Sequence, residues 1–190
     1  MRKGFSLVEL LVVLGIMGVL ILAGTDFLVQ VVRNANRAAV ENEVRQNASK
    51  IMQDMVSSIR GASCVDWEVR STPGYPAGNG DVVVRTYSDN CVSKVDEFQF
   101  VFDPVRRGVQ GIVLRNGRII SSPGVAVISC PGTNQCATTG CVNGLSVSGT
   151  SGSNAAVTLG LAVQSTTSAS QTFFCATTSL SNSVTPRVKY

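Results

Sequence analysis

One long apolar run near the N-terminus limits what this chain can fold into more than any other feature. Residues 5–23 contain a single charged side chain, Glu9. A helix over this run spans about 28 Å, close to the roughly 30 Å hydrocarbon core of a membrane. Arg2 and Lys3 precede the run, so the positive-inside bias places the N-terminus in the cytoplasm. The sequence therefore predicts a single-pass membrane protein with its remaining residues outside the cytoplasm.

The apolar run is better interpreted as an uncleaved anchor than as a secretory signal peptide. A signal peptide would end in small residues with a cleavage site after the apolar segment. Here the run continues through residues 23–25 into a helical pattern, and the first proline is Pro73.

The composition argues against several classes of enzyme. The chain has no histidine, which removes Ser-His and Cys-His nucleophile pairs and every imidazole metal site. No cluster of acids and no activated serine stands out in the sequence either. We therefore expect no catalytic residues, no metal and no cofactor.

Glu9 is the most informative residue of the apolar run. A carboxylate inside a membrane helix costs about 2.5–3.5 kcal/mol on insertion scales, so it usually has a partner and a function. The simpler alternative is that Glu9 lies near the membrane interface and snorkels or becomes protonated.

The residues around Glu9 favour the functional interpretation. Residues 3–10 read Lys-Gly-Phe-Ser-Leu-Val-Glu-Leu. This segment resembles the class III leader of type IV pilins and pseudopilins, in which a short basic leader ends in Gly, Phe follows, and Glu is the fifth residue of the mature chain. The resemblance implies that a prepilin peptidase cuts between Gly4 and Phe5 and that the new Phe5 amine is N-methylated. It also implies that Glu9 neutralises the N-terminal amine of a neighbouring subunit as the helices stack into a filament.

Beyond the apolar run, apolar residues recur at helical spacing up to a plausible stop at Gly61. The predicted apolar face consists of Leu28, Val32, Ala35, Ala39, Val44, Ala48, Ile51, Met55 and Ile59. Glu41 and Arg45 have the spacing of an i,i+4 ion pair. A helix over residues 5–60 would be about 84 Å long, which suits a pilin shaft.

The period changes after Cys64, and we expect an antiparallel sheet packed on the outer half of the helix. Strands are predicted at residues 81–87, 97–103, 124–129 and 157–163, and a hairpin at 112–120. Phe98, Phe100 and Phe102 share one face of their strand and are expected in the core. Asn116 and Gly117 predict a type I′ turn, and residues 71–80 predict a loop. The result is an α+β fold, as the pilin resemblance also implies.

Residues 119–186 carry no charged side chain and are rich in Ser, Thr and Gly. Disorder is one interpretation, and a β-rich surface stapled by disulfides is the one we favour. Six cysteines allow fifteen pairings. Our hypothesis pairs Cys64 with Cys91, Cys136 with Cys141, and Cys130 with Cys175. A four-thiolate zinc site of Cys130, Cys136, Cys141 and Cys175 is the alternative, disfavoured because no C-x-x-C spacing occurs.

Four arginines, Arg106, Arg107, Arg115 and Arg118, follow one another without an intervening acid. They define a candidate nucleic-acid contact, although a solvated hairpin face is the favoured interpretation.

These features predict four segments: a cytoplasmic leader at 1–4 that is removed, a transmembrane and filament-core helix at 5–27, its amphipathic continuation at 28–61, and an extracytoplasmic β-rich head at 62–190. The expected function is that of a minor pilin of a type IV pilus, resembling the W/J-type minor subunits near residues 45–62. The alternatives are a minor pseudopilin of a type II secretion system, a membrane-anchored binding protein and an anchored enzyme. The expected partners are other pilins, the prepilin peptidase and the inner-membrane assembly platform, and the final location is the pilus at the cell surface.

Overall fold

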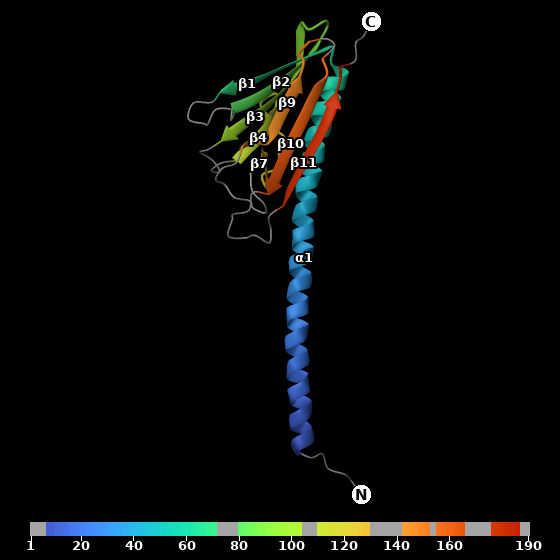
Figure 1. Cartoon of the computed structure of the whole chain (residues 1–190), viewed down its shortest axis with the longest axis vertical. Helices are drawn as coiled ribbons and strands as arrows, with labels where there is room; N and C mark the ends of the chain where they lie inside the picture. The colour runs from blue at the N-terminus through green and yellow to red at the C-terminus, as the bar shows by residue number, and fades with distance from the viewer. Residues whose placement is uncertain are drawn as a thin grey trace. The chain divides into compact units, whose positions relative to one another are not determined.

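A computed structural model describes residues 7–71, 80–103, 110–129, 142–152, 155–165 and 176–186 (Figure 1). The chain divides into two compact units, Met1–Ala38 and Ala39–Tyr190. A single helix, α1 (Leu7–Gly61), supplies the described part of the first unit and continues into the second. The helix ends at the glycine that the sequence singled out as its stop. Residues 5 and 6, where the helix was expected to begin, lie outside the described residues.

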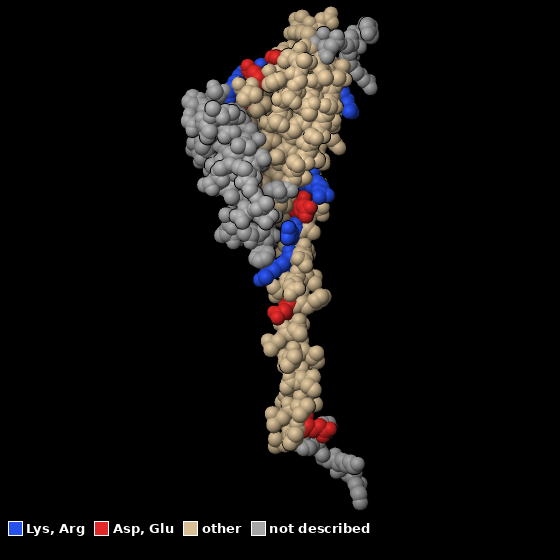
Figure 2. Space-filling view, viewed as in Figure 1, with Lys and Arg blue, Asp and Glu red and all other residues tan. Residues whose placement is uncertain are grey.

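In the first unit α1 is a helix whose described side chains are all exposed to solvent. It is long and apolar enough to cross a membrane, judged by length and composition. Figure 2 shows uncharged side chains over most of its visible surface. An isolated helix with such a surface requires lipid or other helices around it, because large exposed apolar patches are rare on monomeric proteins in water.

In the second unit one face of α1 is buried and carries the apolar stripe. Its buried side chains are Val44, Ala48, Ile51, Met52, Met55, Val56 and Ile59. The predicted face is therefore confirmed from Val44 onward, and Met52 and Val56 widen it. Leu28, Val32, Ala35 and Ala39 continue the same spacing but are exposed. Helical periodicity identifies a face, whereas burial depends on which part of the helix has a sheet beside it.

The first sheet is a five-stranded antiparallel meander in the order β1-β2-β3-β4-β5. Its strands are β1 (Cys64–Ser71), β2 (Gly80–Ser88), β3 (Ser93–Asp103), β4 (Gln110–Arg115) and β5 (Arg118–Ile119). Strand β1 was not predicted, although Val65, Trp67 and Val69 alternate in it. Phe98 and Phe100 are fully buried in the core, as expected, while the Phe102 side chain lies outside what the structure describes.

The β4–β5 hairpin has the predicted turn. Asn116 and Gly117 have φ values of 50° and 78°, and a type I′ turn requires positive φ at both positions. The predicted loop at 71–80 falls mainly on residues outside the described ranges.

Among its described residues, the rest of the second unit forms two further sheets, whereas the sequence predicted a single antiparallel sheet for the whole head. In the larger sheet β10 (Val157–Ser165) lies between β11 (Thr177–Val184) on one side and β9 (Leu145–Gly149) and β6 (Val125–Ala126) on the other, all antiparallel. A small sheet pairs β7 (Ile128–Ser129) with β8 (Val142–Asn143). Alternate residues of β10 are buried, so the described part of the uncharged region is an ordered sheet.

One core joins the helix to both larger sheets. It contains the buried face of α1, Val82, Val84, Phe98, Phe100 and Val113 of the first sheet, and Leu145, Val157, Leu159, Leu161 and Val163 of the second. The second unit is therefore an α+β structure in which a helix packs on antiparallel sheets.

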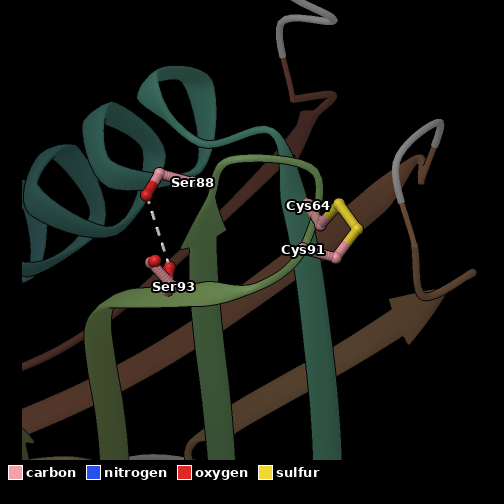
Figure 3. The surroundings of a disulfide bond; sticks show 4 residues. All are labelled: Cys64, Ser88, Cys91 and Ser93. Atoms are coloured by element: carbon pink, nitrogen blue, oxygen red, sulfur yellow. Dashed lines mark hydrogen bonds between the residues drawn. A yellow bond between two sulfur atoms is a disulfide. The ribbon is translucent and has the colours of Figure 1, made fainter.

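A disulfide closes one end of the first sheet. It joins Cys64, at the start of β1, to Cys91, in the loop between β2 and β3, with 5.3 Å between the Cα atoms (Figure 3). This is the first of the three pairs proposed from the sequence. Cys130, Cys136, Cys141 and Cys175 lie outside the described residues. At the two ends of this loop the hydroxyl of Ser88, the last residue of β2, donates a hydrogen bond of 3.5 Å to the carbonyl oxygen of Ser93, the first residue of β3.

Candidate functional site

The segment with the clearest functional signal is the N-terminal part of α1. Glu9 lies in the first helical turn and is exposed. Among the described residues it has no ion-pair partner within hydrogen-bonding reach. Gly4 and Phe5 lie outside the described residues, so the structure adds nothing on the predicted cleavage and methylation positions.

The surface that surrounds and follows Glu9 is apolar on all sides of the helix. Its large exposed side chains include Leu11, Leu14, Ile16, Met17, Leu20 and Leu22, each more than half exposed. A carboxylate in such surroundings becomes costly once lipid or other helices replace the water. Neutralisation or pairing of Glu9 would therefore favour entry of the segment into an apolar environment.

The second unit contains a polar cluster that the sequence reasoning missed. Asp96 on β3 is 6% exposed and accepts hydrogen bonds from residues of α1, β4 and the β4–β5 turn. Arg115 Nη2 donates to Asp96 Oδ2 at 2.8 Å and Arg115 Nε donates to Oδ1 at 3.1 Å. Ser58 Oγ on α1 donates to Oδ2 at 2.7 Å, and Asn116 Nδ2 donates to Oδ1 at 2.9 Å.

These donors stabilise the ionised form of Asp96. The Arg115 guanidinium is the largest influence and holds the pKa of Asp96 below its usual value. Burial acts in the opposite direction, and the hydrogen bonds from Ser58 and Asn116 reinforce the lowering. The cluster is therefore a buried, charge-assisted connection between the helix and the first sheet, and this geometry indicates a structural role.

The contacts of the Arg115 side chain differ from what the sequence predicted. It was grouped with Arg106, Arg107 and Arg118 as a basic stretch on a solvated hairpin face. Instead, its guanidinium is committed to Asp96 and lies 5.5 Å from the centre of the Phe98 ring. Arg118 is exposed, and Arg106 and Arg107 lie outside the described residues. The acid that pairs with Arg115 is distant in sequence, so counting nearby acids could not reveal it.

The outer face of the first sheet carries a second charged cluster centred on Arg85. Arg85 Nη2 lies 2.6 Å from Glu68 Oε1, and Arg85 Nε lies 3.1 Å from Glu97 Oε2. Lys94 lowers the pKa of Glu97, with a further contribution from Arg85, and Arg85 and Arg70 lower the pKa of Glu68. These pairs cross β1, β2 and β3 and balance the charge of this face. On α1 the predicted pair of Glu41 and Arg45 is present at 3.1 Å.

Comparison with known proteins finds a match for the N-terminal segment. Residues 1–25 match the family model described as the prokaryotic N-terminal methylation motif, which is the signature of type IV pilins and pseudopilins. No curated protein and no solved structure matches the chain. The match covers Gly4, Phe5 and Glu9 and ends before the second unit begins, so the functional signal lies in the segment that the sequence first drew attention to.

Proposed function

We propose, from the prepilin-type motif that the chain carries, that it is a minor pilin incorporated into a type IV pilus through its N-terminal helix. The observation that carries this proposal is the combination of the motif with an exposed apolar helix that contains one carboxylate, Glu9. Pilins and pseudopilins are structural subunits, and the role proposed here is assembly without catalysis.

Processing would create a positively charged N-terminal amine that can pair with the Glu9 carboxylate. A prepilin peptidase would remove residues 1–4 on the cytoplasmic face and methylate the new amine of Phe5. Gly4 suits this step because a residue without Cβ lets the backbone lie close to the protease. The cut leaves a cationic amine about one helical turn from Glu9.

Assembly would then replace lipid by neighbouring helices. Before assembly the segment 5–27 would cross the inner membrane with the second unit in the periplasm, since Arg2 and Lys3 favour a cytoplasmic N-terminus. In the filament, Glu9 would pair with the N-terminal amine of a neighbouring pilin. An unpaired buried charge is costly, so this pair would set the axial register as well as attract the next subunit.

Mass spectrometry of the chain recovered from the membrane fraction tests the proposal. We expect a mature protein that lacks residues 1–4 and carries one methyl group on Phe5, and the unprocessed chain in a strain without prepilin peptidase. An intact Met1, or cleavage after Ala23, would contradict the proposal.

A minor pseudopilin of a type II secretion system is the second candidate. Major pilins commonly carry a kinking proline where this chain has Asp26, which favours a minor subunit of either system. The two candidates differ in their assemblies. Deletion of a minor pilin would reduce surface pili and leave protein secretion intact, whereas deletion of a pseudopilin would block secretion. Immunolabelling of sheared pili would then locate the subunit in the filament.

A further inference from the structure

The loop between β2 and β3 has an unusual backbone. Its residues 89–91, Asp-Asn-Cys, have φ values of 50°, 55° and 72°, all in the left-handed region. Residues other than glycine visit this region mostly singly, because Cβ then lies close to the following carbonyl oxygen. The amide of Val92 donates a hydrogen bond of 3.2 Å to the carbonyl oxygen of Ser88 and closes the loop. We call residues 89–92 the left-handed turn.

The three left-handed residues differ in how well they tolerate this conformation. Asp89 and Asn90 belong to the residue types that adopt it most readily after glycine, because their short polar side chains bond locally. Cys91 has no such side chain and has the largest φ of the three. A conformation of this kind persists only where its surroundings hold it. The contacts of the turn therefore decide whether it forms.

Few contacts among the described residues hold the left-handed turn. All four of its residues are exposed, Val92 to 79%, and none belongs to the core. The Ser88 hydroxyl lies 3.1 Å from Asp89 Oδ2 and 3.5 Å from the carbonyl oxygen of Ser93. It has one proton and can donate to only one of them at a time. Exposed hydrogen bonds of this kind replace bonds to water and contribute little.

The disulfide ties the left-handed turn to a buried residue. Cys64 is 2% exposed and begins β1, which pairs with β2 along all eight of its residues. Just before it, the amide of Ser63 donates a hydrogen bond of 2.8 Å to the carbonyl oxygen of Tyr87. Figure 3 shows Cys64 and Cys91 joined beside the turn. Cys91 is thus bonded to a residue that the sheet holds in place.

We propose that the Cys64–Cys91 disulfide is a redox-sensitive clamp that keeps residues 89–91 left-handed. A thiolate of a dithiol reductant attacks Cys91 Sγ, the sulfur of the exposed partner, and the Cys64 thiolate leaves. The second thiol of the reductant then releases Cys91, so the dithiol becomes a disulfide and both cysteines become thiols. The turn relaxes to ordinary backbone angles and loses the bond between Val92 and Ser88, while β1 and β2 stay paired.

The backbone cost of the turn acts against its own clamp. The left-handed angles are imposed only while the disulfide is closed, so their cost favours the reduced form. The disulfide is therefore easier to reduce than one that closes a relaxed loop. This clamp lies in the second unit and operates independently of the proposed assembly through the N-terminal helix.

Hydrogen exchange of the purified full-length chain, in mild detergent, tests the release of the turn. Dithiothreitol should accelerate exchange of the Val92 amide at least about tenfold, because its hydrogen bond is lost. The Ile120 amide donates to the Val113 carbonyl oxygen at 2.9 Å in the β4–β5 hairpin and should stay protected. Cys64→Ala with Cys91→Ala should show the same fast exchange at Val92 without reductant. Unchanged protection at Val92, or loss of protection at both amides in this variant, would overturn the proposal.

Glycine variants test the backbone cost separately. Asp89→Gly with Asn90→Gly removes the Cβ penalty at positive φ. The dithiol concentration that reduces half of the Cys64–Cys91 bond, measured by acid quenching, alkylation and peptide mapping, should rise at least about threefold.

Val92→Gly is the matched control, because Val92 has no positive φ. Glycine there only adds freedom to the reduced chain, so the dithiol concentration should stay the same or fall. No rise for the double variant, or an equal rise for Val92→Gly, would refute the clamp. These outcomes do not depend on prepilin processing or pilus incorporation, which are measured separately.

Discussion

Ser58 on α1 donates a hydrogen bond of 2.7 Å to Oδ2 of Asp96 on β3, and this contact connects the last turns of the helix to the first sheet. The same carboxylate accepts a bidentate pair of hydrogen bonds from Arg115. Together with the apolar core around Ile51 and Met55, the Asp96 cluster fixes this part of α1 on the sheet.

Replacement Asp96→Asn should lower the free energy of unfolding by about 2–4 kcal/mol, because Arg115 loses its buried counter-charge. Chemical denaturation of the detergent-solubilised chain measures this change. Asp66→Asn is the matched control, because the Asp66 side chain is half exposed and its Oδ2 lies 3.6 Å from Arg85 Nη1 in a longer ion pair. It should cost less than about 1 kcal/mol. Equal losses in the two variants would show that the Asp96 cluster has no special role.

The stability of the second unit should fall in acid because of Asp96. The folded state lowers the pKa of Asp96 from its usual 3.8, so the stabilisation is complete above that value. It is lost as the pH falls through the lower pKa of the folded state. Thermal melts at about pH 5 and pH 3 should show a larger decrease for the unmodified chain than for Asp96→Asn. Glu97 titrates in both proteins, so parallel curves would refute the assignment to Asp96.

Removal of the disulfide by Cys64→Ala with Cys91→Ala should destabilise the chain by about 3–4 kcal/mol, judged by the loop-entropy model for the sequence separation of 27. Thermal denaturation measures the loss. Val92→Ala changes an exposed neighbour in the same loop and should have little effect. Peptide mapping without reduction should recover a Cys64–Cys91 peptide, and a link from Cys64 to any other cysteine would contradict this.

Gly111→Ala should destabilise the second unit by about 1–3 kcal/mol through overpacking. A Cβ at Gly111 would overlap the ring of Phe100, which is fully buried, and the carbonyl oxygen of Val127. Combining it with Phe100→Leu should recover part of the loss in a chemical denaturation series. Gly61→Ala is the control because its Cβ would have no neighbour within 4 Å. A neutral Gly111→Ala would mean that the backbone relaxes freely there.

Glu9→Val should insert in the membrane normally and fail to enter filaments efficiently, because the neighbour's amine would then remain unpaired. Cell fractionation and the amount of subunit in sheared pili measure the two steps. Glu41→Val removes an acid from the exposed continuation of the same helix and should leave incorporation unchanged. Normal incorporation of Glu9→Val would exclude an assembly role for this residue.

Several parts of the fold were predictable because their signals are local. The helix follows from hydropathy and periodicity, and its end follows from the glycine that comes after the last apolar residue of the stripe. The Asn116–Gly117 turn and the strands around Phe98 and Val157 follow from turn chemistry and alternation. Strand β11, with the sequence Thr-Thr-Ser-Leu-Ser-Asn-Ser-Val, was missed because Ser and Asn supply half of its residues and only Leu180 and Val184 are apolar. Its pairing with the buried strand β10 makes it a strand.

By itself, the sequence determined the long apolar segment, the prepilin-type motif and the position of Glu9, because hydropathy and a short motif depend only on neighbouring residues. Only the tertiary structure decided that Arg115 pairs with Asp96, that the apolar stripe of α1 is buried from Val44 onward, and that the described part of the uncharged region is an ordered sheet. These properties depend on contacts between residues far apart in the chain. Strand pairing and helix–sheet packing create those contacts, and no local pattern specifies them.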